Sequence, residues 1–144
     1  MTSTRIYVPL NAARLRSLDA DRAIGGTPFL AYAVTAAAQA ATPTADQDEC
    51  EYAALSDAVR GSAALLTSAE SRRIVAAADV MDEVVGPAPD GSIDESAVTI
   101  LESVALNRIA SFHVDDDDAD EDDELSWYDV TELPVILAFL NPQT

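Results

Sequence analysis

Acidic residues crowd one short segment near the C-terminus: nine of the ten residues 115–124 carry carboxyl groups. Carboxylates at this density attract hard cations, so weak binding of Mg²⁺ or Ca²⁺ is expected there. An approximate EF-hand register places ligands at positions one, three, five and twelve, namely Asp118, Asp120, Asp122 and Asp129. The sixth position, however, is Asp123 where that loop requires glycine, and the twelfth is aspartate rather than glutamate. The segment is therefore not expected to be an EF-hand.

A second candidate metal site combines Asp79, Asp115 and Asp116, each of which lies at the carboxyl end of a predicted strand. If these strands are parallel neighbours, their carboxyl ends lie at the same edge of the sheet. The three carboxylates would in that case be close enough to bind one Mg²⁺ ion. This arrangement would suit a metal-dependent hydrolase or a phosphoryl-transfer enzyme. The chain has no Gly-rich phosphate loop, GxSxG elbow or CxxC pair, so that chemistry would depend on carboxylates alone.

His113 is the only histidine, and it lies in an alternating strand between Phe112 and Val114. A catalytic role would pair it with Asp115 or Asp116. Residues two apart on a strand share a face, but their side chains do not necessarily meet at hydrogen-bonding distance. A structural role for His113 is therefore the simpler expectation, and no catalytic residue is assigned.

Trp127 and Tyr128 follow the acidic segment directly and could anchor a protein partner with a basic surface. In that hypothesis the aromatic residues supply affinity and the acids accelerate association. The predicted interaction residues are Asp117, Asp118, Asp120, Glu121, Trp127 and Tyr128. The simpler alternative places Trp127 in the core and makes residues 115–124 a mobile, solvated loop. Because the two aromatics alternate on a strand, one of them should face inward.

The charge distribution narrows the classes of partner. Residues 1–45 hold four arginines and two aspartates, whereas residues 46–144 hold four arginines and 24 acids, for a net charge of −18 overall. Such a field repels nucleic acids and anionic membranes and favours cationic partners. An acidic mimic of DNA remains a further alternative, although mimicry needs charges fixed on a rigid surface.

The location expected for the protein is the cytoplasm. The longest apolar segment, residues 133–140, is far shorter than the roughly 20 residues that span a bilayer. Cys50 is the only cysteine, so no disulfide can form within the chain, which fits a reducing compartment. No signal peptide is recognisable in the opening residues. No cofactor is predicted beyond weak binding of divalent cations.

The pattern of elements predicts an α/β or α+β fold in one domain that covers residues 1–144. Strands are expected at 5–10, 28–34, 74–80, 97–104, 108–114 and 125–130, and helices at 12–24, 36–41, 46–66 and 132–140. The first strand, helix and strand should form a parallel, right-handed βαβ unit in a mixed sheet of five or six strands. In the longest helix, Tyr52, Leu55, Val59, Ala63 and Leu66 form an apolar stripe that should face the sheet.

Several strings of the chain together resemble a family of uncharacterised actinobacterial proteins: RIYVPL, FLAYAVT, EYAAL, RRIVAAADV, NRIASFHVDD and LSWYDVTELP. The resemblance implies an actinobacterial, cytoplasmic source, and it implies no activity. Members of that family usually carry a longer, helix-like insert where this chain has only the acidic segment. Because the sequence has no catalytic signature and its charge is asymmetric, we expect a non-enzymatic domain that acts in regulation or as an adaptor through protein–protein interaction.

Overall fold

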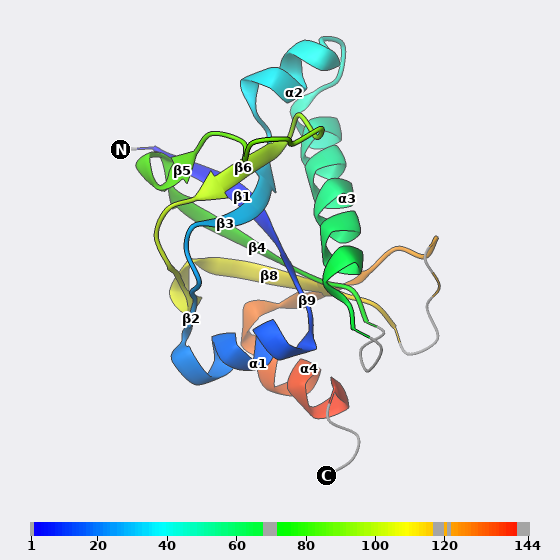
Figure 1. The fold of residues 1–144 in the computed structure, drawn as a ribbon. Coiled ribbons are helices and arrows are strands. Elements are labelled where there is room, and N and C mark those ends of the chain that lie inside the picture. Colours follow the sequence, from blue (N-terminus) through cyan, green and yellow to red (C-terminus); the bar gives the residue numbers. More distant parts are fainter. Residues whose placement is uncertain (1, 68–71, 117–119, 121, 141–144) are drawn as a thin grey trace.

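The computed structural model describes residues 2–67, 72–116, 120 and 122–140, and its main element is a seven-stranded sheet (Figure 1). The strand order is β5-β6-β3-β1-β4-β8-β9, and a separate two-stranded sheet pairs β2 with β7. The strands are β1 Ser3–Leu10, β2 Ala23–Ile24, β3 Phe29–Ala33, β4 Ile74–Met81, β5 Val85–Gly86, β6 Ala97–Ile100, β7 Val104–Ala105, β8 Ile109–Val114 and β9 Ser126–Asp129. The helices are α1 Ala12–Asp21, α2 Ala36–Ala41, α3 Gln47–Leu65 and α4 Leu133–Leu140, with short 3₁₀ turns at Asp82–Val84, Leu106–Arg108 and Val130–Glu132.

Three of the helices, α1, α2 and α3, begin at a residue whose side chain caps the first turn. Asn11 accepts a hydrogen bond from the Arg14 amide at the start of α1, and Thr35 accepts one from Ala38 at the start of α2. At the start of α3, Asp46 and Glu49 form a complete capping box, each side chain accepting from the other residue's backbone N–H. These contacts satisfy amide groups that have no partner within their own helix.

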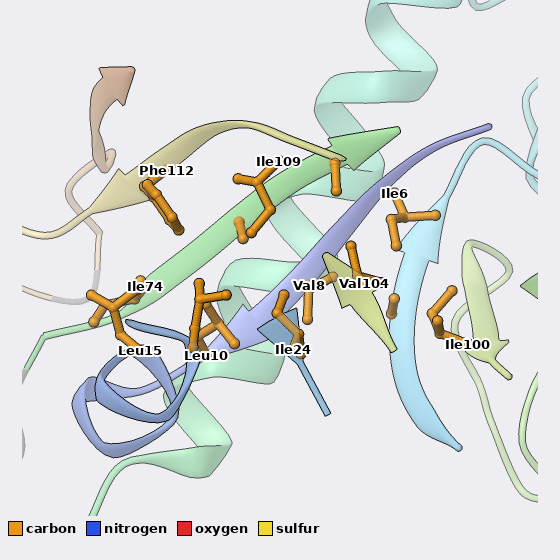
Figure 2. Close-up of a cluster of buried hydrophobic side chains, with 14 of the residues drawn as sticks. Ile6, Val8, Leu10, Leu15, Ile24, Ile74, Ile100, Val104, Ile109 and Phe112 are labelled. Carbon is orange, nitrogen blue, oxygen red and sulfur yellow. The ribbon is translucent and has the colours of Figure 1, made fainter. Parts of the chain in front are cut away.

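One face of the main sheet forms the larger part of the core. Alternation along β1 directs Ile6, Val8 and Leu10 to this face, where they cluster with Leu15 of α1 (Figure 2). Buried side chains of α4 belong to the same cluster. Phe112 on β8 joins the same cluster and is fully buried. The face is thus covered by two helices and the small β2–β7 sheet.

The opposite face is covered by α3, which contacts β1, β3 and β4. The buried side of this helix is made of small residues: Cys50, Ala54, Ala58 and Ser62. A Cβ atom at Gly61 would lie 3.2 Å from atoms of both Pro9 and Tyr32, so α3 approaches the sheet closely. The predicted stripe of larger residues is wrong in part, because Tyr52 is 58% exposed and Ala63 is exposed as well. Small residues face the sheet because they permit this close packing.

The α/β class predicted from the sequence is confirmed, with seven strands in the main sheet rather than five or six. The predicted parallel pairing at the start is wrong, because β1 and β3 are adjacent but antiparallel, with Ile6 opposite Ala33. The short segment formed by α1 and β2 keeps the chain at the end of the sheet where β1 finishes, so β3 runs back alongside it (Figure 1). All the strand pairs between described residues are antiparallel.

Candidate functional site

The acidic segment begins with a buried ion pair between Asp115 and Arg73. The register of β4 with β8, in which Ile74 lies opposite Val114, places these two residues side by side at the strand ends. The Asp115 carboxylate accepts hydrogen bonds from Arg73 Nε at 2.7 Å, Nη2 at 2.8 Å and the backbone N–H at 2.9 Å. The side chains are only 9% and 5% exposed. Hydrogen bonding to Asp115 raises the pKa of Arg73, so the guanidinium stays charged.

Arg73 also holds the rest of the described acidic segment. Its Nη2 donates to the carbonyl oxygens of Asp120 at 2.8 Å and Asp123 at 3.0 Å. The Asp120 and Asp123 side chains then accept from the amides of Asp122 and Asp120, which closes a turn. One guanidinium thus donates hydrogen bonds to a carboxylate and two carbonyl oxygens, which are the kind of oxygen ligands that would also suit a metal cation. The predicted interaction residues Asp117, Asp118 and Glu121 lie outside the described residues.

Asp79 lies at the other end of β4, opposite Arg5 of β1. Its carboxylate accepts from Arg5 Nε at 2.8 Å and Nη2 at 2.9 Å, and this hydrogen bonding lowers the pKa of Asp79. Asp79 is six residue steps along an extended strand from Arg73, a separation of roughly 20 Å. Because β4 and β8 are antiparallel, the structure does not bring Asp79 and Asp115 together. The parallel arrangement on which the predicted Mg²⁺ site depends is therefore wrong.

Asp116, the third predicted ligand, is exposed and accepts a hydrogen bond from Ser126 Oγ at 2.8 Å. Within the described residues, no group of three or more histidine, cysteine, aspartate and glutamate side chains is arranged to hold a metal ion. The carboxylates that the structure describes near the strand ends instead bind arginine and serine side chains.

His113 lies on the part of the sheet face that α3 leaves open, because α3 packs over β1, β3 and β4. It stands between Val75 of β4 and Trp127 of β9 in the register of the sheet. Its Nε2 is 3.4 Å from Ser111 Oγ, and no contact of His113 with either Asp115 or Asp116 is found among the described residues. Burial, and secondarily the charge of Arg5, lower the pKa of His113, so the imidazole is neutral at pH 7.

Trp127 and Tyr128 point to opposite faces of β9. Tyr128 packs toward the core, with its ring centroid 5.9 Å from that of Phe139 on α4. Trp127 is 61% exposed on the α3 side, so the prediction that places it in the core is wrong. The rule that one of the two faces inward is correct, and the inward residue is Tyr128.

Trp127 is connected with three further residues by strand register, by proximity along the chain and through one hydrogen bond. On the α3 side, the Tyr52 hydroxyl donates to Glu124 Oε1 at 3.0 Å, which joins the helix to the end of the acidic segment. His113 lies opposite Trp127 on the neighbouring strand. We call these four residues, Tyr52, His113, Glu124 and Trp127, the Trp127 surface. Tyr52 was missed as a surface residue because helical periodicity predicts it to face the sheet.

Replacing His113 with glutamine should flatten the dependence of stability on pH. The pKa of His113 is lower in the folded than in the unfolded chain, where it lies near 6.5. As the pH falls through this value, His113 binds a proton in the unfolded chain before it does so in the folded chain. Protonation therefore stabilises the unfolded state, and the free energy of unfolding decreases. Urea unfolding at pH 5 to 8 should therefore show the wild type losing stability relative to the variant toward pH 5. If the difference in the free energy of unfolding between the wild type and His113→Gln were the same at every pH, the lowered pKa of His113 would be contradicted.

The comparisons with known proteins place the chain in a family. No helix in the described part of the chain has the length and apolar character needed to cross a membrane. No curated protein and no solved structure matches the chain. A model for the family of unknown function DUF6912 matches residues 4–137, which confirms the resemblance to an uncharacterised family. The chain therefore belongs to the family of unknown function DUF6912.

Proposed function

We propose that the protein is a non-enzymatic, cytoplasmic binding domain that holds a basic segment of a partner protein against the Trp127 surface. The observation that carries this proposal is the exposure of Trp127, on an open sheet face, directly after a run of carboxylates. Tryptophan is enriched among the residues that contribute most of the binding energy at protein–protein interfaces.

The acidic segment supplies electrostatic complementarity. Its described residues Asp116, Asp120 and Asp122 are exposed, as are Asp123 and Glu124. Because Arg73 binds the backbone of this segment, the described carboxylates are held in place beside the fold before a partner arrives. Preorganisation lowers the entropy lost on binding, and the net charge of −18 steers a cationic partner toward the protein.

Trp127 adds a short-range contact for the same kind of partner. The face of an indole ring attracts the guanidinium of arginine or the ammonium of lysine, and tryptophan is the aromatic residue with the strongest such attraction. Tyr52 and Glu124, which are joined by a hydrogen bond, belong to the same proposed surface. A segment rich in arginine would satisfy both the ring and the carboxylates.

The enzymatic alternative receives less support from the geometry. Asp79 is paired with Arg5, Asp115 with Arg73, and the closest polar contact of His113 is with Ser111. A general base needs a free acceptor within reach of a substrate proton, and a metal centre needs converging ligands. Among the described residues, the groups predicted for such chemistry each contact an arginine or serine side chain, and Asp79 lies apart from Asp115.

The test uses Trp127→Ser, with Val135→Ser as the matched control. Val135 is a second large apolar residue, 55% exposed, on α4 at the other side of the sheet. Partners captured from native lysate would be purified and titrated by calorimetry. We expect Trp127→Ser to weaken binding at least about tenfold, the scale of a hot-spot aromatic, and Val135→Ser to leave it unchanged. Because Trp127 is the only tryptophan, its fluorescence should also change during the titration.

A second variant isolates the electrostatic contribution. It combines Asp116→Asn, Asp122→Asn and Glu124→Gln and retains Asp115, whose carboxylate is part of the fold. Association with the partner should become slower and less sensitive to salt, because steering by charge is screened by ions. Equal binding of the wild type, Trp127→Ser and this variant would refute the proposal. Displacement of the partner by duplex DNA would favour mimicry of DNA instead.

A further inference from the structure

A cleft of about 690 Å³ opens on the side of the sheet away from α3. It lies between the end of α1, the turn that follows β7, and the start of α4. The lining includes Asp19, Arg22, Leu106, Asn107, Val130 and Leu133. This volume is within the range of clefts that hold small molecules.

The cleft combines an apolar lining with a few polar groups. Leu133 is buried, and Leu106 and Val130 are half-buried and pack against the core, so these three side chains present a fixed apolar surface. Asp19, Arg22, Asn107 and Thr131 supply the polar groups. An apolar cavity with a small number of polar groups is the common composition of a small-molecule site.

Arg22 has an unusual backbone conformation for its residue type. It caps the end of α1 with φ 59° and ψ 26°, the left-handed region that favours glycine or asparagine. In the part of the chain that the structure describes, it is the one residue other than glycine with a positive φ. Gly25 and Gly26 follow three and four residues later, yet this position carries a long cationic side chain. Backbone strain at a residue that lines a cleft points to a role for its side chain.

The Arg22 guanidinium donates hydrogen bonds to described residues through one of its three nitrogen atoms. Its Nη1 donates to the Asp19 carbonyl at 3.3 Å and to Asp19 Oδ1 at 3.1 Å, distances that are long for hydrogen bonds between charged groups. The Arg22 side chain is 64% exposed and that of Asp19 46%, so solvent weakens this ion pair. Nε and Nη2 donate to no acceptor among the described residues. A guanidinium edge of this kind matches the two oxygens of a carboxylate.

We propose that this cleft binds a small amphipathic carboxylate. The apolar chain or ring of the ligand lies on Leu106, Val130 and Leu133, and its carboxylate accepts hydrogen bonds from Arg22. The Asn107 side-chain amide, exposed at the same rim, supplies a further donor. A cationic ligand fits less well, because the one carboxylate in the lining, that of Asp19, already faces Arg22. The site is independent of the Trp127 surface, which lies on the α3 side of the sheet.

The experiment titrates the full chain with octanoate by calorimetry, with 1-octanol and octylamine as probes of equal chain length. Octanoate is expected to bind saturably with a Kd below about 1 mM, the range expected for a ligand of this size. The alcohol should bind at least about tenfold more weakly, because it lacks the charge-assisted hydrogen bonds. The amine should show no binding at this site.

Two variants make the result specific to Arg22. Arg22→Gly removes the guanidinium and relieves the left-handed backbone, so it should fold at least as well as the wild type while losing octanoate binding at least about tenfold. Arg60→Gln is the matched control, because Arg60 forms the same kind of i,i+3 ion pair with Asp57 on α3, on the other face of the sheet. It should bind octanoate like the wild type.

Three outcomes would overturn the proposal. These are an absence of saturable octanoate binding in the wild type, equal binding of octanoate and octanol, and equal binding of octanoate by the wild type and Arg22→Gly. None of them depends on a partner at the Trp127 surface, so failure here and failure of the proposed function are distinguishable.

Discussion

Replacing Asp115 with alanine is expected to lower the free energy of unfolding by about 3–5 kcal/mol, the usual cost of breaking a buried ion pair from one side. The variant leaves the Arg73 guanidinium 9% exposed and without its carboxylate. The backbone N–H of Arg73 loses its acceptor at the same time. Urea unfolding at pH 7, followed by circular dichroism, measures the difference.

Asp116→Ala is the matched control for this prediction. It removes an identical carboxylate one residue along, but Asp116 is exposed and accepts a hydrogen bond from the Ser126 hydroxyl at the surface. We expect its effect to stay within about 1 kcal/mol, as for other surface charges. The change in net charge is the same in both variants, so the comparison isolates burial and pairing. Similar losses in the two variants would show that the Arg73 contact adds little.

The double variant Arg73→Met, Asp115→Leu extends the test. Removing both partners of a buried ion pair leaves no unpaired charge, so the double variant should be more stable than Asp115→Ala alone. Its acidic segment would nevertheless lose the donor to the carbonyls of Asp120 and Asp123. Retained stability together with weakened partner binding would therefore separate the role of Arg73 in the fold from its role in positioning the carboxylates.

The starts of the helices and the positions of the main strands could be predicted from the sequence because their signals are local. Asn11, Thr35 and the Asp46–Glu49 box lie within three residues of the amides that they satisfy. Alternation of apolar residues likewise marks β1 and β8 within single segments. Such patterns need no knowledge of which strands are neighbours.

The direction of strand pairing and the partners of the carboxylates could not be predicted in the same way. Arg73 precedes β4 and Asp115 follows β8, 42 residues away, and only the antiparallel register brings them together. The face of α3 was predicted in part incorrectly for a different reason. Helical periodicity predicts that large apolar residues such as Tyr52 face the sheet. In the structure the helix lies close to the sheet, and the small residues Ala54, Ala58 and Ser62 are buried there instead. The alternation of side chains along β9 also does not determine which of Trp127 and Tyr128 faces inward.

Ser62 is the second residue whose replacement should have a large effect. It is fully buried on α3, and its Oγ donates to the Leu10 carbonyl at 2.5 Å while accepting from the Ile74 amide at 2.8 Å. Leu10 and Ile74 are opposite one another at the ends of β1 and β4. One hydroxyl therefore joins the helix to two strands at the point where their pairing ends.

Ser62→Ala should lower the free energy of unfolding by about 2–4 kcal/mol. The change leaves a buried carbonyl and a buried N–H without this partner, and each unsatisfied group costs about 1–3 kcal/mol. Ser56→Ala, a half-buried serine on the same helix, should change stability by about 0.5 kcal/mol or less and controls for helix propensity. Urea unfolding measures both variants, and hydrogen exchange should show faster exchange of the Ile74 amide in Ser62→Ala alone. Equal stability of the two variants would mean that water or a shifted backbone satisfies both groups, and the hydroxyl would then not be what fixes α3 to the sheet.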